Sequence, residues 1–259
     1  MKDSHYRQND FLNLLRPTKA FLPMVLAMML LHGCREVAPN PTKERTESKL
    51  PETVQADTVM KPTEGFPHKK FKRFEEVADT AFVRLADYSD GFAYDMRYAT
   101  ENNFLKAQVY DCPECYTRAK TAKALIAANA EFKTHGLRIK FFDCYRPNAI
   151  QYKMWEIMPN PQYVANPKKG SIHNRGGAVD ITLETLEGET LDMGTDFDFF
   201  GKKAHHDHTD LSEEVLANRK LLKEVMEKHG FWSIRTEWWH YNLSAASRDP
   251  VANFRWDCP

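Results

Sequence analysis

Two short motifs that lie far apart in the sequence constrain the fold of this chain most strongly. The first, Ser171–Asp180, contains His173 and Asp180, and the second, Glu-Trp-Trp-His, runs from Glu237 to His240. Two imidazoles and one carboxylate are a set that a catalytic zinc ion uses when its fourth position stays open for water. The chain can use this set only if its fold brings the two segments together. Glu237 is then free to accept a proton from the attacking water and to return it to a leaving amine.

The motif pair belongs to a longer pattern. Ser-x-His-x-x-Gly-x-Ala-x-Asp followed by Glu-x-Trp-His resembles the zinc-dependent D-alanyl-D-alanine peptidases of peptidoglycan metabolism, and most closely the D-alanyl-D-alanine dipeptidases of the vancomycin-resistance (VanX) type. The resemblance covers roughly residues 70–250 and implies one zinc ion per chain and hydrolysis of D,D-dipeptides. Further segments that carry it, in the expected order, are Met96–Phe104, Asp143–Pro147, Met193–Phe199 and Glu237–Tyr241.

The chemistry of the residues and the resemblance together assign roles around the zinc. Zinc would polarise the scissile carbonyl, Glu237 would deprotonate the attacking water, and the resulting oxyanion would need a second positive partner. Arg146 is the candidate for that partner, because a guanidinium stays charged at any working pH and the matching arginine has this role in the family. In an arbitrary protein, an arginine before a proline is more often a surface ion-pair donor. The resemblance also implies a substrate pocket with Asp198 and Tyr98 at the amino end of the dipeptide, and with Ser171 and Tyr110 beside them.

Hydrophobic periodicity predicts a mixture of helices and strands. A strand over 137–141 places Arg146 at a strand-to-helix junction, where Pro147 can open the next helix. In the strand Gly176–Leu183, Asp180 shares its face with a glycine and an alanine, which leaves room for a metal and a substrate; close packing is the alternative explanation. Because regular βαβ units are lacking, we expect a single α+β catalytic domain with a central, mainly antiparallel sheet flanked by helices. The expected helices cover 117–134, 147–158 and 212–229, the last capped by Asp210 or Ser212, and the last expected strand covers 231–243.

The last expected strand contains a conflict. Glu237 and His240 are three positions apart, so a regular strand would point them to opposite faces. A shared site therefore requires a bulge or a turn near Trp238.

Two polar runs are predicted to lie outside the site. The run His205–His208 resembles a metal cluster in composition, but adjacent residues rarely converge on one ion, so we expect a solvated loop near the rim of the active site. Glu184, Glu187 and Glu189 are predicted to form the surface of a hairpin.

The first part of the chain has the pattern of an export signal. Basic residues precede the apolar stretch Ala20–Leu31, which is too short to span a bilayer, and Cys34 follows it. In a bacterial lipoprotein, cleavage before this cysteine leaves a thiol that carries lipid; the alternative is an ordinary secretory signal with an incidental cysteine. We therefore expect a lipoprotein-type signal over 1–33, a flexible tether rich in Pro, Thr, Glu and Lys over 34–67, and the catalytic domain over 68–259. This predicts a periplasmic or cell-envelope protein, lipid-anchored at the outer membrane.

Cysteine usage and charge add two constraints. The other four cysteines form an even set in an exported chain, which predicts disulfides without fixing their pairing. The alternatives are a redox pair at Cys112 and Cys115, or a structural zinc site of which these two are one half and the other two cysteines complete the set. The chain has 36 basic and 36 acidic residues and 42% hydrophobic residues, so it can bury one core and gives no electrostatic basis for a nucleic-acid partner. The four cysteines are Cys112, Cys115, Cys144 and Cys258.

Three functions are compatible with these features. The first is zinc-dependent hydrolysis of D-alanyl-D-alanine during cell-wall peptide turnover. The second is a D,D-carboxypeptidase or an L,D-endopeptidase that acts on peptidoglycan stem peptides with the same metal chemistry. The third is a metal-containing module that binds wall peptides without cleaving them. The expected partner is thus a D,D-dipeptide or a stem peptide.

Overall fold

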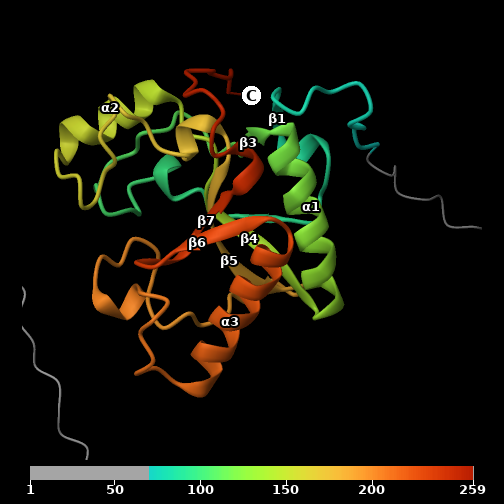
Figure 1. Cartoon of the computed structure of the whole chain (residues 1–259), viewed down its shortest axis with the longest axis vertical. Helices are drawn as coiled ribbons and strands as arrows, with labels where there is room; N and C mark the ends of the chain where they lie inside the picture. The colour runs from blue at the N-terminus through green and yellow to red at the C-terminus, as the bar shows by residue number, and fades with distance from the viewer. Residues whose placement is uncertain (1–69, 259) are drawn as a thin grey trace, which may run out of the picture. The chain divides into compact units, whose positions relative to one another are not determined.

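A central sheet of five strands organises the structure, a computed structural model that describes residues 70–258 (Figure 1). β2 runs parallel to β4, and the other neighbouring strands pair antiparallel. A separate two-stranded sheet pairs β1 (Phe82–Arg84) with β3 (Tyr116–Arg118). The α+β class with a mainly antiparallel central sheet is therefore confirmed. In spatial order the central strands are β2 (Ala93–Tyr94), β4 (Leu137–Asp143), β5 (Ala178–Thr185), β7 (Glu237–Leu243) and β6 (Phe231–Ile234).

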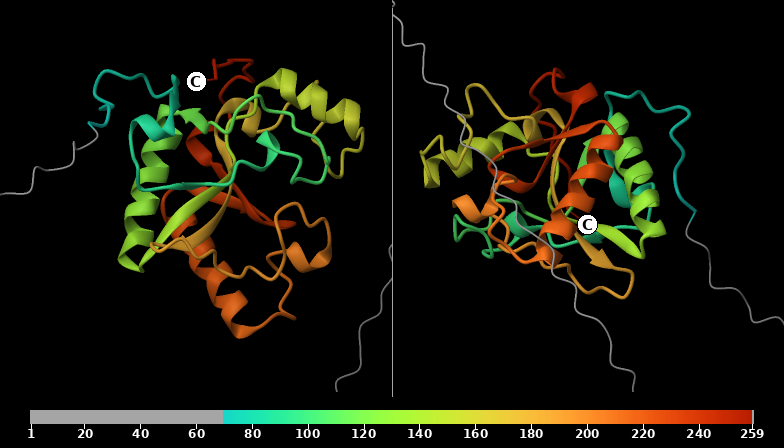
Figure 2. Two further views of the ribbon diagram at one scale, coloured as in Figure 1. Left: turned by 180° about the vertical axis from the view of Figure 1, so that it is seen from behind. Right: turned by 60° about the horizontal axis from the view of Figure 1, so that its bottom comes forward.

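Three α-helices surround this sheet. α1 (Ala119–Thr134) and α3 (Glu213–Lys228) contact the sheet and each other, and they bury apolar residues such as Leu125 and Leu222. α2 (Asn148–Ile157) lies on the opposite side of the central strands from α1 (Figures 1 and 2). No helix between residues 70 and 258 is long and apolar enough to cross a membrane. The expected signal and tether segments lie outside the described residues.

The helix boundaries differ from the expected ones by one or two residues, for local reasons. α1 begins at Ala119 instead of 117, because Thr117 pairs with Val83 and so belongs to a strand. α2 begins directly after Pro147, whose fixed backbone suits the start of a helix. α3 is capped by Ser212, whose hydroxyl accepts a hydrogen bond from the backbone N–H of Val215 at 3.3 Å.

The single strand expected over 231–243 is wrong, because the chain turns at residues 235–236 and forms two strands. The bulge that would let Glu237 and His240 share one site is present in the pairing of β6 with β7. Ser233 pairs with Tyr241, but the next residue, Ile234, pairs with Glu237. Residues 238–240 therefore lie opposite no residue of β6. This irregularity brings Glu237 Oε2 to 4.0 Å from His240 Nδ1.

The prediction that Glu184 lies on a hairpin surface is also wrong. β5 extends to Thr185, and Glu184 is buried beside β4, where Arg138 Nη2 lies 2.6 Å and Lys140 Nζ 3.1 Å from its carboxylate. A buried carboxylate needs such partners, and β4 supplies two. Glu187 and Glu189 are exposed in the turn, as expected.

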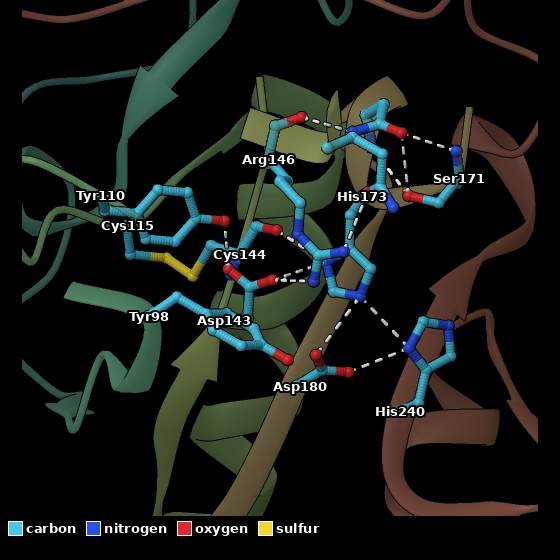
Figure 3. A network of polar contacts seen from close by, with 12 residues as sticks. Tyr98, Tyr110, Cys115, Asp143, Cys144, Arg146, Ser171, His173, Asp180 and His240 are labelled. Atoms are coloured by element: carbon cyan, nitrogen blue, oxygen red, sulfur yellow. Dashed lines mark hydrogen bonds and ion pairs between the residues drawn. A yellow bond between two sulfur atoms is a disulfide. The ribbon is translucent and has the colours of Figure 1, made fainter. Parts of the chain in front are cut away.

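Two disulfides join the four cysteines of the described region. Cys115 pairs with Cys144 at the end of β4, and Cys112 pairs with Cys258 near the C-terminus. The first bond lies beside the residues that the sequence assigns to the active site (Figure 3). The second bond ties the C-terminal segment to the loop before β3.

Candidate active site

Three side chains from three different elements converge in one place (Figure 3). His173 begins the short 3-10 helix η3 (His173–Arg175), Asp180 lies on β5, and His240 lies opposite Asp180 on β7. His173 Nε2 is 3.2 Å from His240 Nδ1 and 3.4 Å from Asp180 Oδ2. His240 Nδ1 is 2.9 Å from Asp180 Oδ1. Within residues 70–258, these are the three side chains that could hold a metal together, and the sequence predicted the same three.

The hydrogen bonds around this cluster fit a zinc ion. His173 Nδ1 donates to the carbonyl oxygen of Cys144 at 2.7 Å, and His240 Nε2 donates to Asn242 Oδ1 at 2.9 Å. In their neutral forms, both imidazoles therefore direct a lone pair toward the carboxylate of Asp180, and three acceptors face each other with no proton among them. A cation removes this conflict. Tetrahedral zinc with bonds of about 2.0–2.2 Å places its ligand atoms roughly 3.3 Å apart, which is close to the separations found here.

Glu237 lies next to the cluster without belonging to it. It is the first residue of β7, and its side chain is 26% exposed. Burial raises the pKa of its carboxyl group and the charge of Asp180 adds to this rise, while the His240 imidazole opposes it. A carboxylate with a raised pKa is a better proton acceptor, as a general base requires.

Arg146 is buried, and its position is fixed by its neighbours. It follows β4 at the junction with α2, and its guanidinium lies over the ring of Tyr98. Arg146 Nη2 donates to Asp143 Oδ2 at 2.5 Å, and Nη1 donates to Gln151 Oε1 at 2.9 Å. The other oxygen of Asp143 accepts a hydrogen bond from the hydroxyl of Tyr110 at 2.7 Å. The sequence places Asp143 in one of the recurring motifs without indicating a role for it, because its complete burial beside Arg146 is visible only in the structure.

A cleft of about 220 Å³ contains most of the proposed substrate-binding residues. The hydroxyl of Tyr98 donates to the carboxylate of Asp198 at 3.0 Å, and Ser171 Oγ donates to Asn174 Oδ1 at 3.1 Å. Burial raises the pKa of Asp198, and Asp180 raises it further. Asp198 has a left-handed backbone with a φ of 60°, a conformation that is uncommon outside glycine and that aspartate tolerates better than most residues. The lining includes Tyr98, Arg146, Ser171, His173, Asp180, Asp198, Glu237 and His240.

Tyr110 does not line this cleft. Its side chain is buried behind Asp143, and the hydrogen bond to Asp143 occupies its hydroxyl. The prediction that Tyr110 lines the pocket is therefore corrected by the structure. The hydroxyl of Tyr110 is directed at the buried carboxylate of Asp143 and not into the cleft.

A row of aromatic rings borders the cleft, and sequence reasoning missed it. Tyr163 and Phe200 both line the cleft, and their ring centroids are 4.7 Å apart. Phe104 continues the row, with its centroid 4.9 Å from that of Phe200 and 6.3 Å from that of Tyr98. The rings come from three separate segments, so no local pattern in the sequence indicates that they meet.

An α+β domain that holds a His-Asp-His cluster beside a glutamate and a buried arginine has the make-up of a metallopeptidase. The chain belongs to the D-Ala-D-Ala dipeptidase family, whose model matches residues 78–256. The resemblance predicted from the motifs is thus confirmed.

Curated relatives agree with this membership. The D-alanyl-D-alanine dipeptidase of Escherichia coli (strain K12) is 32% identical over 179 residues, which cover 69% of this chain and 93% of that protein. Proteins of the same name from Enterococcus faecalis (strain ATCC 700802 / V583) and Enterococcus faecium are each 30% identical. The matches cover 64% of this chain and 92% of the first protein, and 70% of this chain and 98% of the second.

Proposed function

We propose that this chain hydrolyses D-alanyl-D-alanine, or a closely related D,D-dipeptide, with a zinc ion held by His173, Asp180 and His240. The convergence of these three side chains next to Glu237 and Arg146, in a member of a dipeptidase family, is the observation that carries the proposal. Zinc bound at this cluster supplies a Lewis acid that polarises the scissile carbonyl and lowers the pKa of water.

Different side chains of the cleft then transfer the proton, stabilise the developing negative charge and bind the substrate. Glu237 accepts the proton of the attacking water and returns it to the nitrogen of the leaving amine. Arg146 donates to the carbonyl oxygen as negative charge develops there, and Asp143 keeps the guanidinium in place for this. Asp198 and the hydroxyl of Tyr98 meet the ammonium group of the dipeptide.

The size and the border of the cleft favour a dipeptide over a longer stem. A cleft of about 220 Å³ is smaller than the pockets of about 300–1,000 Å³ that take drug-sized ligands. Tyr163 and Phe200 line it, and Phe104 packs behind them against Phe200 and Tyr98, on the side where a longer peptide would continue beyond the ammonium position. A D,D-carboxypeptidase or an L,D-endopeptidase would need an open groove at this point.

The deciding experiment measures the release of free D-alanine from two substrates in parallel. Full-length protein is incubated with D-alanyl-D-alanine and with a pentapeptide stem, each with zinc and after exhaustive chelation. We expect zinc-dependent release from the dipeptide and none from the stem. Release of D-alanine and tetrapeptide from the stem would instead support the carboxypeptidase, and full activity after chelation would contradict a metallopeptidase.

We also propose that the protein is exported and lipid-anchored through Cys34, with residues 34–67 as a tether. Two disulfides in the catalytic domain support export, because such bonds persist in oxidising compartments. Cell fractionation together with metabolic labelling by a palmitate analogue tests this. We expect label in the membrane fraction for the natural chain and none for a Cys34→Ala variant; label-free soluble protein in both cases would contradict the anchor. An exported enzyme of this kind would act on dipeptides that are released from the cell wall.

A further inference from the structure

The histidine-rich loop after η4 (Lys202–Ala204) contacts the turn between β6 and β7 (Figure 1). Three successive residues of the loop contact the same arginine in the turn. The backbone N–H of His206 donates to the carbonyl oxygen of Arg235 at 2.9 Å. The guanidinium of Arg235 lies 3.0 Å from His205 Nδ1 and 3.3 Å from Asp207 Oδ2. The loop therefore holds both the main chain and the side chain of Arg235.

The loop is itself fastened to α3. Arg219 of α3 is 5% exposed, and its guanidinium donates to three backbone carbonyl oxygens. One of them, that of His205 at 3.3 Å, belongs to the loop, and another, that of Lys203 at 3.0 Å, belongs to η4 directly before it. The third belongs to Met193, at 2.7 Å. A buried guanidinium requires such acceptors, so these bonds fix the loop to a long helix that packs on the sheet.

The turn that the loop holds leads directly to Glu237, the proposed general base. Glu237 follows Arg235 by two residues and is the first residue of β7. Glu237 pairs with Ile234 of β6, but the three residues after it, 238–240, lie opposite no residue of that strand. The start of β7 is thus held in place by the histidine-rich loop as well as by the hairpin.

We infer that this loop is a brace for the general base, and that Arg235 is a positioning residue of the reaction. The inference rests on the proposed hydrolysis. Arg235 is not among the residues that line the cleft, so its loss changes the orientation of Glu237 and leaves substrate binding intact. The side chain of Arg235 is 62% exposed, and exposed ion pairs contribute little to folding stability. Catalysis is more sensitive, because small displacements of a catalytic group are costly.

The test compares Arg235→Gln and Arg235→Lys with the natural chain, and Arg248→Gln at an exposed position serves as the matched control. Full-length protein loaded with zinc is assayed on D-alanyl-D-alanine for kcat and KM, together with its zinc content and Tm. For Arg235→Gln we expect kcat to fall about ten-fold, in line with the cost of misplacing a reacting group, with KM, zinc content and Tm unchanged. Arg235→Lys should recover part of kcat. A kcat equal to that of the control, or a loss of zinc in step with kcat, would overturn the inference.

Hydrogen exchange gives a readout that is independent of activity. In Arg235→Gln, peptides covering residues 231–243 should exchange faster than in the Arg248→Gln control, whereas peptides covering α1 should not change. If the natural chain does not cleave the dipeptide, the proposed function fails, and the exchange measurement still decides the brace. Equal exchange over residues 231–243 in both variants would refute the brace whatever the activity.

Discussion

A change at Glu237 can test catalysis separately from metal binding, because Glu237 lies beside the three proposed ligands and is not one of them. Replacing it with glutamine keeps the shape of the side chain and removes the proton acceptor. We predict that Glu237→Gln lowers kcat for D-alanyl-D-alanine by about 10²–10⁴-fold, the usual contribution of a general base, with zinc content unchanged. Steady-state kinetics and metal analysis check this, with exposed Glu189→Gln as the control. Parent-like behaviour of Glu237→Gln in every assay would favour a module that binds wall peptides without cleaving them.

Asp143 makes a second residue-level prediction, which concerns stability. Its carboxylate is fully buried and accepts hydrogen bonds from Arg146 and Tyr110. Asp143→Ala leaves the Arg146 guanidinium buried without its counter-charge, so the free energy of unfolding should fall by about 3–5 kcal/mol. Urea denaturation measures this. The control, Asp111→Asn, breaks an exposed ion pair with Arg255 and should stay within about 0.5 kcal/mol of the parent. An equal small effect of both changes would contradict a supporting role for Asp143.

Sequence patterns predicted the residues of the site unevenly, for a physical reason. His173, Asp180, Glu237 and His240 follow from a motif whose spacing matters for chemistry, and the structure brings all four together. The hydroxyl of Tyr110 and the rings that border the cleft depend on contacts between distant segments. Such contacts leave no local periodicity in the sequence, so only the folded chain shows them.

At the level of elements, helices and strands followed from periodicity wherever the chain carried a start or stop signal. Pro147 and Ser212 both mark helix starts that the structure contains. The hairpin over 231–243 was missed because its turn is Arg235-Thr236, which lacks the glycine, asparagine or proline that usually marks a turn. The aromatic and β-branched residues on both sides favour extended structure equally, so they gave no sign of two strands.

The loop that carries His206 gives a prediction on pH and stability. Burial lowers the pKa of the His206 imidazole from 6.5 to about 4, and the charges of Lys223 and Arg219 add to this. Between pH 6.5 and about 4 the unfolded chain therefore binds a proton that the folded chain excludes, so the free energy of unfolding falls as the pH falls through this window. In His206→Gln this contribution disappears, so the parent should lose stability relative to the variant as acid is added.

Urea denaturation of zinc-free protein at several pH values measures this difference. His135→Gln, at an exposed position after α1, is the control and should follow the parent across the window. A stability difference between parent and His206→Gln that stays constant from pH 7 to pH 4 would contradict the prediction.

On the scale of the whole molecule, the two disulfides support different parts of the structure. The Cys115–Cys144 bond fixes the backbone whose carbonyl oxygen, at Cys144, accepts the hydrogen bond from His173 Nδ1. The Cys112–Cys258 bond joins residues 146 positions apart and ties down the C-terminal segment. Chain-entropy arguments assign each bond about 3–5 kcal/mol of stability, more for the longer loop. Stability alone therefore cannot separate their roles, but metal affinity can.

We predict that the double variant Cys115→Ala/Cys144→Ala binds zinc at least about ten-fold more weakly, because partners that orient a metal-binding histidine typically contribute that much. The double variant Cys112→Ala/Cys258→Ala should lose as much stability or more and keep its zinc affinity, since its bond holds no residue that contacts the cluster. Competition with a chelator measures affinity, and urea denaturation measures stability on the same samples. Equal losses of zinc affinity in the two double variants would show that general loosening of the fold, and not the carbonyl of Cys144, controls the metal site.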